Sequence, residues 1–219
     1  MSNDPDFEAK LVDVVGLYLD PPERAVVFSF DENTQVQALD QTQLWFPLKA
    51  GRRRTMTHDY KRNGTVDLLA AMNVGTSEVL HDTRRRHAGT DVLAFFKWTD
   101  LHVDAEVDIH VVLDNLSAHK CQPVRDWLAH PKRDRWHLHF TPTSASWLNL
   151  IESWFSVLTR KALHDASFTS ITGLEATIDT WASHPNDDPQ PFVWTKTVDD
   201  IITNVKLGQA SLTEPATHH

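Results

Sequence analysis

Two acidic residues stand directly behind short apolar runs of the sequence. Asp31 follows the run from Ala25 to Phe30, and Asp114 follows the run from Ile109 to Leu113. Runs of this length, rich in β-branched residues and bounded by polar ones, are typical of strands buried on both faces. An ionised carboxylate beside such a strand is costly unless a cation pairs with it. We therefore expect two neighbouring strands, each ending in a carboxylate that faces a cation.

A third acid, Glu152, lies in a segment with helical periodicity. After a loop at 141–144, the sequence predicts a helix from about Trp147 to Leu163 with Ser146 as its N-cap. Glu152 falls at the border of an apolar stripe made of Trp147, Leu150, Ile151, Trp154, Val157 and Leu158. From that border it can reach toward the end of a sheet. Taken alone, it is more simply a solvated glutamate of a helix surface.

Considered one at a time, the three carboxylates have ordinary structural explanations. Considered together, they favour the binding of divalent metal ions. Hard divalent cations prefer oxygen ligands. Two such ions about 3.5 to 4 Å apart can activate an attacking oxygen and stabilise a leaving one. Asp31, Asp114 and Glu152, converging from two strands and a helix, therefore predict a two-metal site for phosphoryl transfer.

The remaining sequence must supply the elements that position these acids. Apolar periodicity predicts a helix over 7–19, and strands over 66–72 and 79–81 joined as a hairpin through 73–76. Further elements are expected between and beyond the acids: a helix over 90–101 capped by Thr90, a helix over 119–128 and a strand over 136–140. This alternation of strands and helices is typical of an α/β domain.

Composition is that of a globular protein with one main domain. The chain has 219 residues, of which 41% are hydrophobic, and its single cysteine, Cys121, excludes an internal disulfide framework. No stretch approaches the roughly 18 to 20 apolar residues that cross a bilayer, and no signal-type segment follows the acidic amino terminus. We expect a soluble, cytoplasmic protein without a membrane partner.

The net charge of −9 is unevenly distributed along the chain. Residues 1–24 carry 2 basic and 6 acidic side chains and residues 163–219 carry 2 and 8, which leaves 17 basic against 16 acidic residues in 25–162. This central part contains basic clusters at 84–87 and 132–135, and the candidates for contact with a DNA backbone: Lys49, Arg52, Arg53, Arg54, Lys61 and Arg62. Such clusters suit phosphates, although solvated loops explain any single one equally well.

A second possible metal site involves His137 and His139, which alternate onto one face of the predicted strand over 136–140. Two histidines can form part of a zinc site. The sequence offers no third ligand at matching spacing, so a strand face in contact with solvent or a helix is the better interpretation.

Four blocks of the sequence resemble the catalytic region of bacterial insertion sequence 630 transposases, relatives of the mariner-like superfamily. They are FSFDENTQVQALD, TMTHDYKRNGT, HVVLDNLSAHK and FTPTSASWLNLIESWF, in order between about Leu17 and Leu163. The resemblance implies an RNase H-like α/β fold with a central five-stranded mixed sheet flanked by helices. It also implies a catalytic domain over 25–165, a linker-like helical segment over 1–24 and a C-terminal helical extension over 166–219. The family's amino-terminal helix-turn-helix domain is not found in this sequence.

The same resemblance assigns roles to individual residues. Asp31, Asp114 and Glu152 match the family's catalytic acids, which hold two Mg²⁺ or Mn²⁺ ions. Asn115, His119 and Asn149 match motif positions expected to orient the ligands or to contact DNA.

The activity implied is cleavage of double-stranded DNA at the ends of a mobile element, followed by transfer of the freed strand into target DNA. The protein is expected to act as a homodimer bound to DNA, in bacterial cytoplasm and on the nucleoid. Because few phosphates would be neutralised by so acidic a chain, we expect weak, non-specific DNA affinity.

Two other functions remain open at this point. The chain could be an RNase H-like nuclease that acts on a different substrate, such as RNA/DNA hybrids or junctions. It could also be an inactive transposase remnant that keeps the fold only for DNA binding or dimerisation. The intact acid trio favours an enzyme.

Overall fold

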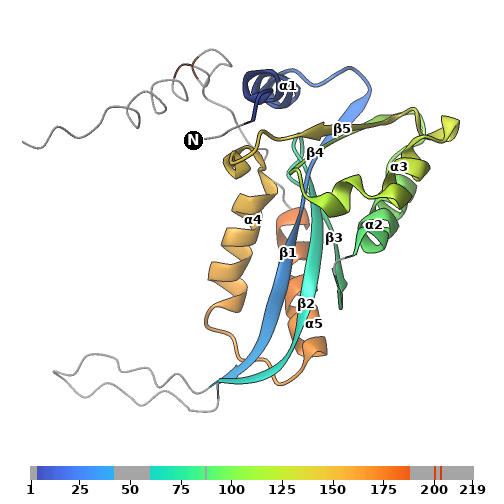
Figure 1. The fold of residues 1–219 in the computed structure, drawn as a ribbon. Coiled ribbons are helices and arrows are strands. Elements are labelled where there is room, and N and C mark those ends of the chain that lie inside the picture. The colour runs from blue at the N-terminus through green and yellow to red at the C-terminus, as the bar shows by residue number, and fades with distance from the viewer. Residues whose placement is uncertain (1–3, 42–59, 87, 188–199, 201–202, 204–219) are drawn as a thin grey trace, which may run out of the picture.

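A central sheet of five strands organises the chain in the computed structural model, which describes residues 4–41, 60–86, 88–187, 200 and 203 (Figure 1). The strand order is β3-β2-β1-β4-β5. The strands are β1 Ala25–Gln41, β2 Tyr60–Asn73, β3 Val79–Arg84, β4 Asp108–Leu113 and β5 Trp136–Phe140. The first three are antiparallel, whereas β4 and β5 run parallel to β1. The predicted five-stranded mixed sheet is therefore confirmed.

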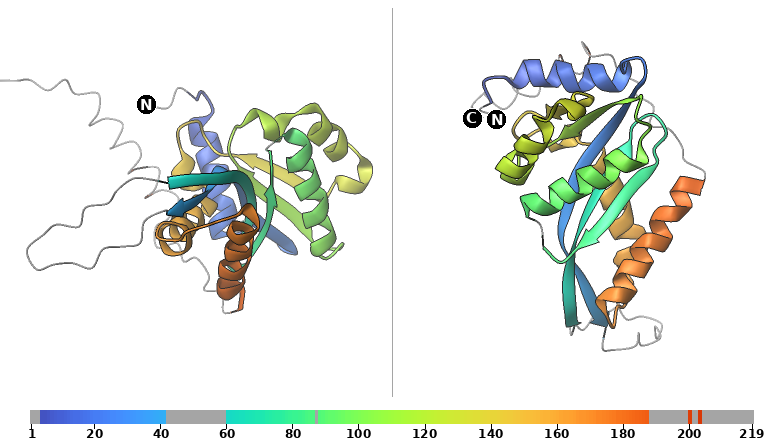
Figure 2. Two further views of the ribbon diagram at one scale, coloured as in Figure 1. Left: turned by 90° about the horizontal axis from the view of Figure 1, so that it is seen from below. Right: turned by 90° about the vertical axis from the view of Figure 1, so that its right-hand side faces the viewer.

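Helices cover both faces of this sheet (Figure 2). One core cluster joins the sheet to three helices, α1 Phe7–Leu19, α4 Ile151–Leu158 and α5 Ile171–Asp187; the other joins it to α2 Gly89–His102 and α3 Gln122–Leu128. Strand β2 feeds both cores by alternation, because Leu68 and Ala70 face the first cluster while Leu69 and Ala71 face the second. No helix in the described part of the chain is long and apolar enough to span a membrane.

Local sequence patterns predicted several of these elements closely. The helix over 7–19 and the strand over 136–140 have the predicted bounds, and the strand before Asp114 begins only one residue early. The predicted hairpin connection is also present. There the Asn73 side-chain oxygen accepts hydrogen bonds from the backbone N–H groups of Gly75 (2.9 Å) and Thr76 (3.3 Å), which fixes the turn between β2 and β3.

The prediction that Asp31 ends its strand was wrong. Strand β1 continues to Gln41 because β2 runs beside it in antiparallel register as far as Tyr60, with two irregularities that absorb the extra residues. The parallel pairing with β4, in contrast, stops at Ser29 and Val112. Asp31 thus lies inside a long strand, at the point where one of its two neighbouring strands has ended.

Two predicted helices are interrupted. The helix expected over 119–128 is a 3₁₀ turn at Ser117–Lys120 followed by α3, because the backbone at Cys121 is extended just before Pro123 in the first turn. The helix expected over 147–163 consists of a 3₁₀ turn at Ser146–Leu148, then α4, then a π-helical turn at Thr159–Leu163.

Two details of the helix predictions also change. Trp147, placed in the apolar stripe by periodicity, is 50% exposed because it belongs to the separate 3₁₀ turn rather than to α4. Thr90 lies inside α2 and does not cap it. The cap is Ala88, whose backbone N–H donates to the Asp91 carboxylate at 2.9 Å.

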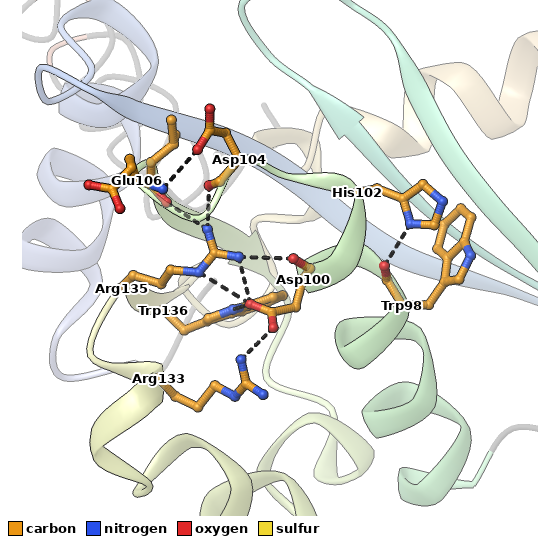
Figure 3. Close-up of polar contacts among 9 residues, drawn as sticks. Trp98, Asp100, His102, Asp104, Glu106, Arg133, Arg135 and Trp136 are labelled. Atoms are coloured by element: carbon orange, nitrogen blue, oxygen red, sulfur yellow. Dashed lines mark hydrogen bonds and ion pairs between the residues drawn. The ribbon is translucent and has the colours of Figure 1, made fainter.

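A buried carboxylate ties the end of α2 to the edge of the sheet (Figure 3). Asp100, with a side chain 9% exposed, accepts hydrogen bonds from Arg135 Nη2 (2.7 Å) and Trp136 Nε1 (2.8 Å), and it pairs with Arg133. Burial alone would raise the pKa of Asp100, but these donors more than offset it and hold the pKa below its usual value. Two arginines of the basic cluster at 132–135 are thus used for folding.

We expect Asp100→Asn to lower the free energy of unfolding by about 2 to 4 kcal/mol, because it leaves two partly buried guanidinium groups without their counter-ion. Urea unfolding at neutral pH measures this. The exposed Asp134→Asn is the control, expected to change stability by less than about 0.5 kcal/mol.

The loss should also depend on pH. The folded-state pKa lies below the unfolded value of about 3.9, so the carboxylate stabilises the fold above that pH and loses its contribution as pH falls. The unfolding curves of wild type and Asp100→Asn should therefore converge below about pH 4. A constant difference down to acid pH would contradict the ionic assignment.

Candidate active site

Sheet register brings Asp31 and Asp114 to neighbouring positions. Strands β1 and β4 pair in parallel from Ala25 with Asp108 to Ser29 with Val112. Continued by two residues, this register sets Asp31 opposite Asp114, and adjacent strands lie only about 4.8 Å apart. The carboxylate of Asp31 is largely buried, with the residue 8% exposed.

The third acid, Glu152, also acts on the Asp31 carboxyl group through its charge. Burial raises the pKa of Asp31 to about 7, and the negative charges of Asp114 and Glu152 add to that increase, while a hydrogen bond from the Glu32 N–H opposes it. The three acids predicted from the sequence therefore share one electrostatic environment. Perturbed carboxyl groups of this kind are typical of functional sites.

Asn149 connects this environment to helix α4. Its Nδ2 donates to Asp31 Oδ2 (2.9 Å) and to the Phe30 carbonyl (3.0 Å), and its Oδ1 accepts from Ser29 Oγ (2.5 Å). Ser29 Oγ in turn accepts from the backbone N–H of Ile151 at 3.0 Å. The first turn of α4, which carries Glu152, is therefore fastened to β1. These bonds also explain why the helix cannot run unbroken through Asn149, which is extended and 1% exposed.

His119 holds the other acid from the opposite side of the sheet. Its Nδ1 lies 3.0 Å from Asp114 Oδ1 and its Nε2 lies 2.8 Å from Glu32 Oε2, with a side chain that is fully buried. Burial alone would lower the pKa of His119, but hydrogen bonds to Asp114 and Glu32 outweigh it and raise the pKa to about 10. The contact with His119 in turn lowers the pKa of Asp114. A charged histidine therefore bridges two carboxylates.

Asn115 has a different set of contacts from the other two motif residues. Its Nδ2 donates to the Thr141 carbonyl (2.6 Å), and its Oδ1 accepts from Lys120 Nζ (2.5 Å). The side chain thus joins the loop after β4 to the loop after β5 and does not bond to any of the three acids. Its effect on the site is to fix the loop that follows Asp114.

Glu152 is exposed in the first turn of α4, on the wall of a groove between that helix and β1. The groove has a volume of about 560 Å³. Its lining residues come from β1, α4 and the π-helical turn: Glu32, Asn33, Thr34, Glu152, Phe155, Ser156, Thr159, Arg160 and His164. Glu152, alone of the three acids, therefore lines a space that a ligand can enter.

Of the six predicted DNA-backbone candidates, the two that the structure describes lie away from this site. Lys49, Arg52, Arg53 and Arg54 lie outside the described residues. Lys61 and Arg62 are exposed on β2, where they pair with Asp40 and Leu39 of β1. At about 3.3 Å per residue, this is roughly 25 Å along the strand from Asp31.

The donor chemistry of the site fits Mg²⁺ or Mn²⁺, because carboxylate oxygens are the ligands these ions prefer. Among the described residues, however, no group of three or more His, Cys, Asp or Glu side chains is arranged closely enough to hold an ion as it stands. One further oxygen is notable. Glu32 Oε1 is buried and has no hydrogen-bond partner.

Sequence reasoning missed Glu32 and Ser29. The signal for Glu32 was its place beside Asp31 in a strand, since alternation sends consecutive side chains to opposite faces of the sheet. Its histidine partner, 87 positions further along the chain, could not be read from that pattern.

The histidines on β5 have a third companion that the sequence did not suggest. His110 of β4 stacks on His137, and its Nδ1 lies 3.0 Å from His139 Nε2. His139 also contacts Asp13 of α1 at 2.8 Å. This cluster links α1 to the sheet edge, and within the described part of the chain it is not a group that could hold a metal ion.

The five-stranded mixed sheet, with three antiparallel strands, two further parallel strands and helices on both faces, is an RNase H-like fold. The sequence model of the family described as "DDE superfamily endonuclease" matches residues 26–175, so the chain belongs to this family. A comparison with curated protein sequences finds no significant match.

Solved structures of a transposase share the fold. The Mos1 mariner paired-end complex with Mn has a TM-score of 0.57 at 13% identity, over 81% of this chain and 54% of the Mos1 chain. The Mos1 strand transfer complex has a TM-score of 0.59 at 12% identity, over 94% and 59%, and the paired-end complex with Mg has 0.56 at 12%, over 85% and 57%. The chain thus spans a little over half the length of these Mos1 chains, and the likeness shows an RNase H-like fold.

We expect His119→Ala to reduce the free energy of unfolding by about 3 to 5 kcal/mol, because it leaves the buried Glu32 carboxylate without a counter-charge. The double variant His119→Ala/Glu32→Gln removes that orphaned charge and should recover part of the loss. Denaturant unfolding of both proteins measures the difference. Equal stability of the single and double variants would show that the Glu32–His119 pair is not the source of the effect.

Proposed function

We propose that this chain is the catalytic domain of a transposase of the insertion sequence 630 type, which cleaves double-stranded DNA with divalent metal ions and transfers the cut strand to target DNA. The observation that carries the proposal is the buried carboxyl group of Asp31, whose pKa is raised by burial and by two further acids. Membership of the DDE superfamily endonucleases supports it. So do the Mos1 complexes, whose names record paired ends, strand transfer, Mn and Mg.

In this proposal Asp31, Asp114 and Glu152 hold two Mg²⁺ or Mn²⁺ ions. When bound, such ions activate the attacking oxygen and stabilise charge that develops on the phosphate. The protein's own contribution is orientation. Asn149 fixes the Asp31 carboxylate from the side of α4, and His119 fixes the Asp114 carboxylate from the opposite side. Both supports are buried, so the orientations of the Asp31 and Asp114 carboxylates are set before DNA binds.

The proposed partners are the DNA ends of the element and a target duplex, engaged by a homodimer in the bacterial cytoplasm. In this proposal residues 25–165 are the catalytic domain, preceded by the segment 1–24 and followed by 166–219, of which 166–187, 200 and 203 are among the described residues. The acidic flanks predict weak, sequence-independent affinity when this chain acts alone, because DNA affinity derives largely from neutralised phosphates. Nanomolar binding to a defined DNA repeat in physiological salt would contradict that part of the proposal.

Metal binding has a direct thermodynamic signature. Ions that bind only the folded chain at about 100 times their dissociation constant add about 2.7 kcal/mol. For a chain of this size, we expect Mn²⁺ to raise the melting temperature by roughly 5 to 10 °C, and the rise to be lost in Asp114→Asn. Thermal unfolding with and without Mn²⁺ measures it. Asp108→Asn, at the exposed opposite end of the same strand, should keep the full response.

DNA cleavage tests the chemistry itself. We expect the chain to nick a DNA duplex in Mn²⁺ or Mg²⁺, and Glu152→Gln to slow the reaction by about 100-fold or more, because it removes a charged ligand from the transition-state environment. Glu106→Gln, a highly exposed glutamate, is the matched control and should cleave at the wild-type rate.

The substrate range then separates the proposed function from its rivals. Equal amounts of DNA duplex, RNA/DNA hybrid and branched DNA are offered to the same protein. Preference for the hybrid or the junction would identify a nuclease of another kind. A folded chain that binds Mn²⁺ and cuts none of the three would instead fit an inactive remnant.

A further inference from the structure

The groove beside the acid trio extends well past the residues that carry the proposed chemistry. Strand β1 and helix α4 run along each other as its two sides (Figure 1). Its volume of about 560 Å³ lies within the range of roughly 300 to 1,000 Å³ typical of ligand sites. Glu152 lines the groove in the first turn of α4, and Arg160 and His164 line it beyond the helix end. The groove is therefore acidic near the active site and basic farther away.

A π-helical turn creates the basic end. The backbone N–H of His164 donates to the Thr159 carbonyl at 2.8 Å, a bond across five residues in place of the usual four. This wider turn places Thr159 and His164, five residues apart, on the same side of the helix. Both residues line the groove, and so does Arg160. Irregular turns of this kind occur frequently at functional sites.

The side chains at this end are available to a ligand. Arg160 is exposed and makes no hydrogen bond or ion pair within the described residues. Its guanidinium offers a planar fork of donors that matches phosphate oxygens. His164 is 68% exposed at its side chain, and its Nδ1 lies 3.1 Å from Asp165 Oδ1, which leaves Nε2 directed elsewhere. The buried ring of Phe155 and the hydroxyls of Ser156 and Thr159 complete the wall.

The length of the groove suits a strand of nucleic acid. Arg160 is the eighth residue after Glu152, which corresponds to a rise of about 12 Å along the helix axis. One strand of B-form DNA advances about 3.4 Å per nucleotide along the helix axis and also winds around that axis, so this distance corresponds to roughly two to three nucleotide steps. A phosphate at the acidic end and a second phosphate at Arg160 could therefore belong to the same strand.

We propose that this groove binds the DNA strand that enters the active site, and that Arg160, assisted by His164, pairs with a backbone phosphate about two to three nucleotides from the cut. The assignment rests on the proposed DNA-cleaving function and adds to it a positioning contact outside the acid trio. Arg160 acts by fixing the register of the strand. Specific bases are not read by such a contact, since phosphates carry no sequence information.

The test uses the full chain and a short fluorescein-labelled DNA duplex. Binding is followed by fluorescence anisotropy over a range of salt concentrations, for wild type, Arg160→Ala and Lys161→Ala. Lys161 is the matched control because it is the adjacent, exposed cation and does not line the groove. We expect Arg160→Ala to weaken binding about tenfold and to reduce the salt slope by about one ion. Melting temperatures verify that both variants fold.

Neutral phosphates then locate the contact. A series of duplexes carries a single methylphosphonate at successive positions near the labelled end, and the loss caused by Arg160→Ala is measured on each. At the position paired with Arg160, the loss of affinity should disappear. The methylphosphonate there is neutral, so the wild-type arginine has no phosphate charge to pair with and its removal costs nothing. The loss caused by Lys161→Ala should stay the same across the series. A loss from Arg160→Ala that is equal at every position, or no larger than that of Lys161→Ala, would overturn the assignment.

The two proposals fail in different ways. Cleavage that needs Asp114, together with the absence of any position-specific effect of Arg160, would leave the endonuclease proposal standing and refute the groove. A position-specific effect in a chain that cuts no DNA would support the groove as a strand-binding site and count against the catalytic proposal. Failure of the wild type to bind any of the duplexes would refute the groove assignment outright.

Discussion

Burial of the Asp31 carboxylate within a sheet, next to two other acids, is the constraint on which the site depends. An ionised group in such a place loses hydration and meets like charges, and both effects raise its pKa to about 7. A fold without a use for this arrangement would gain stability by replacing the acid. The sheet keeps it at the position where the pairing of β1 with β4 has ended, one residue before the part of β1 that lines the groove begins at Glu32.

Two hydrogen-bonded supports, one on each face of the sheet, make this arrangement tolerable. On the α4 face, Asn149 and Ser29 connect Asp31 to the start of the helix that carries Glu152. On the other face, His119 pairs with both Asp114 and the buried Glu32. Because each support fixes both an acid and a secondary-structure junction, the geometry of the site and the packing of the fold are coupled. Loss of either support is therefore felt in both.

Whether a basic side chain is suited to bind phosphate depends on where the fold places it. The chain is acidic overall, and two arginines that looked suited to phosphate instead hold Asp100 at the edge of the sheet (Figure 3). Arg160, in contrast, belongs to no conspicuous basic cluster, yet it lies on the groove that leads from the acids.

Local periodicity in the sequence was enough to define the helix over 7–19, the strands on either side of α3 and the two acids that follow apolar runs, because burial of one face imposes a repeat on neighbouring residues. It also indicated an α/β sheet, and motif resemblance indicated the RNase H-like class. Only the tertiary structure decided that β1 runs on past Asp31, that Asn149 breaks its helix and that Glu32 pairs with His119. Each of these depends on a partner far away in the chain, β2 or β1 or the turn after β4, whose backbone and side-chain bonds outweigh local preference.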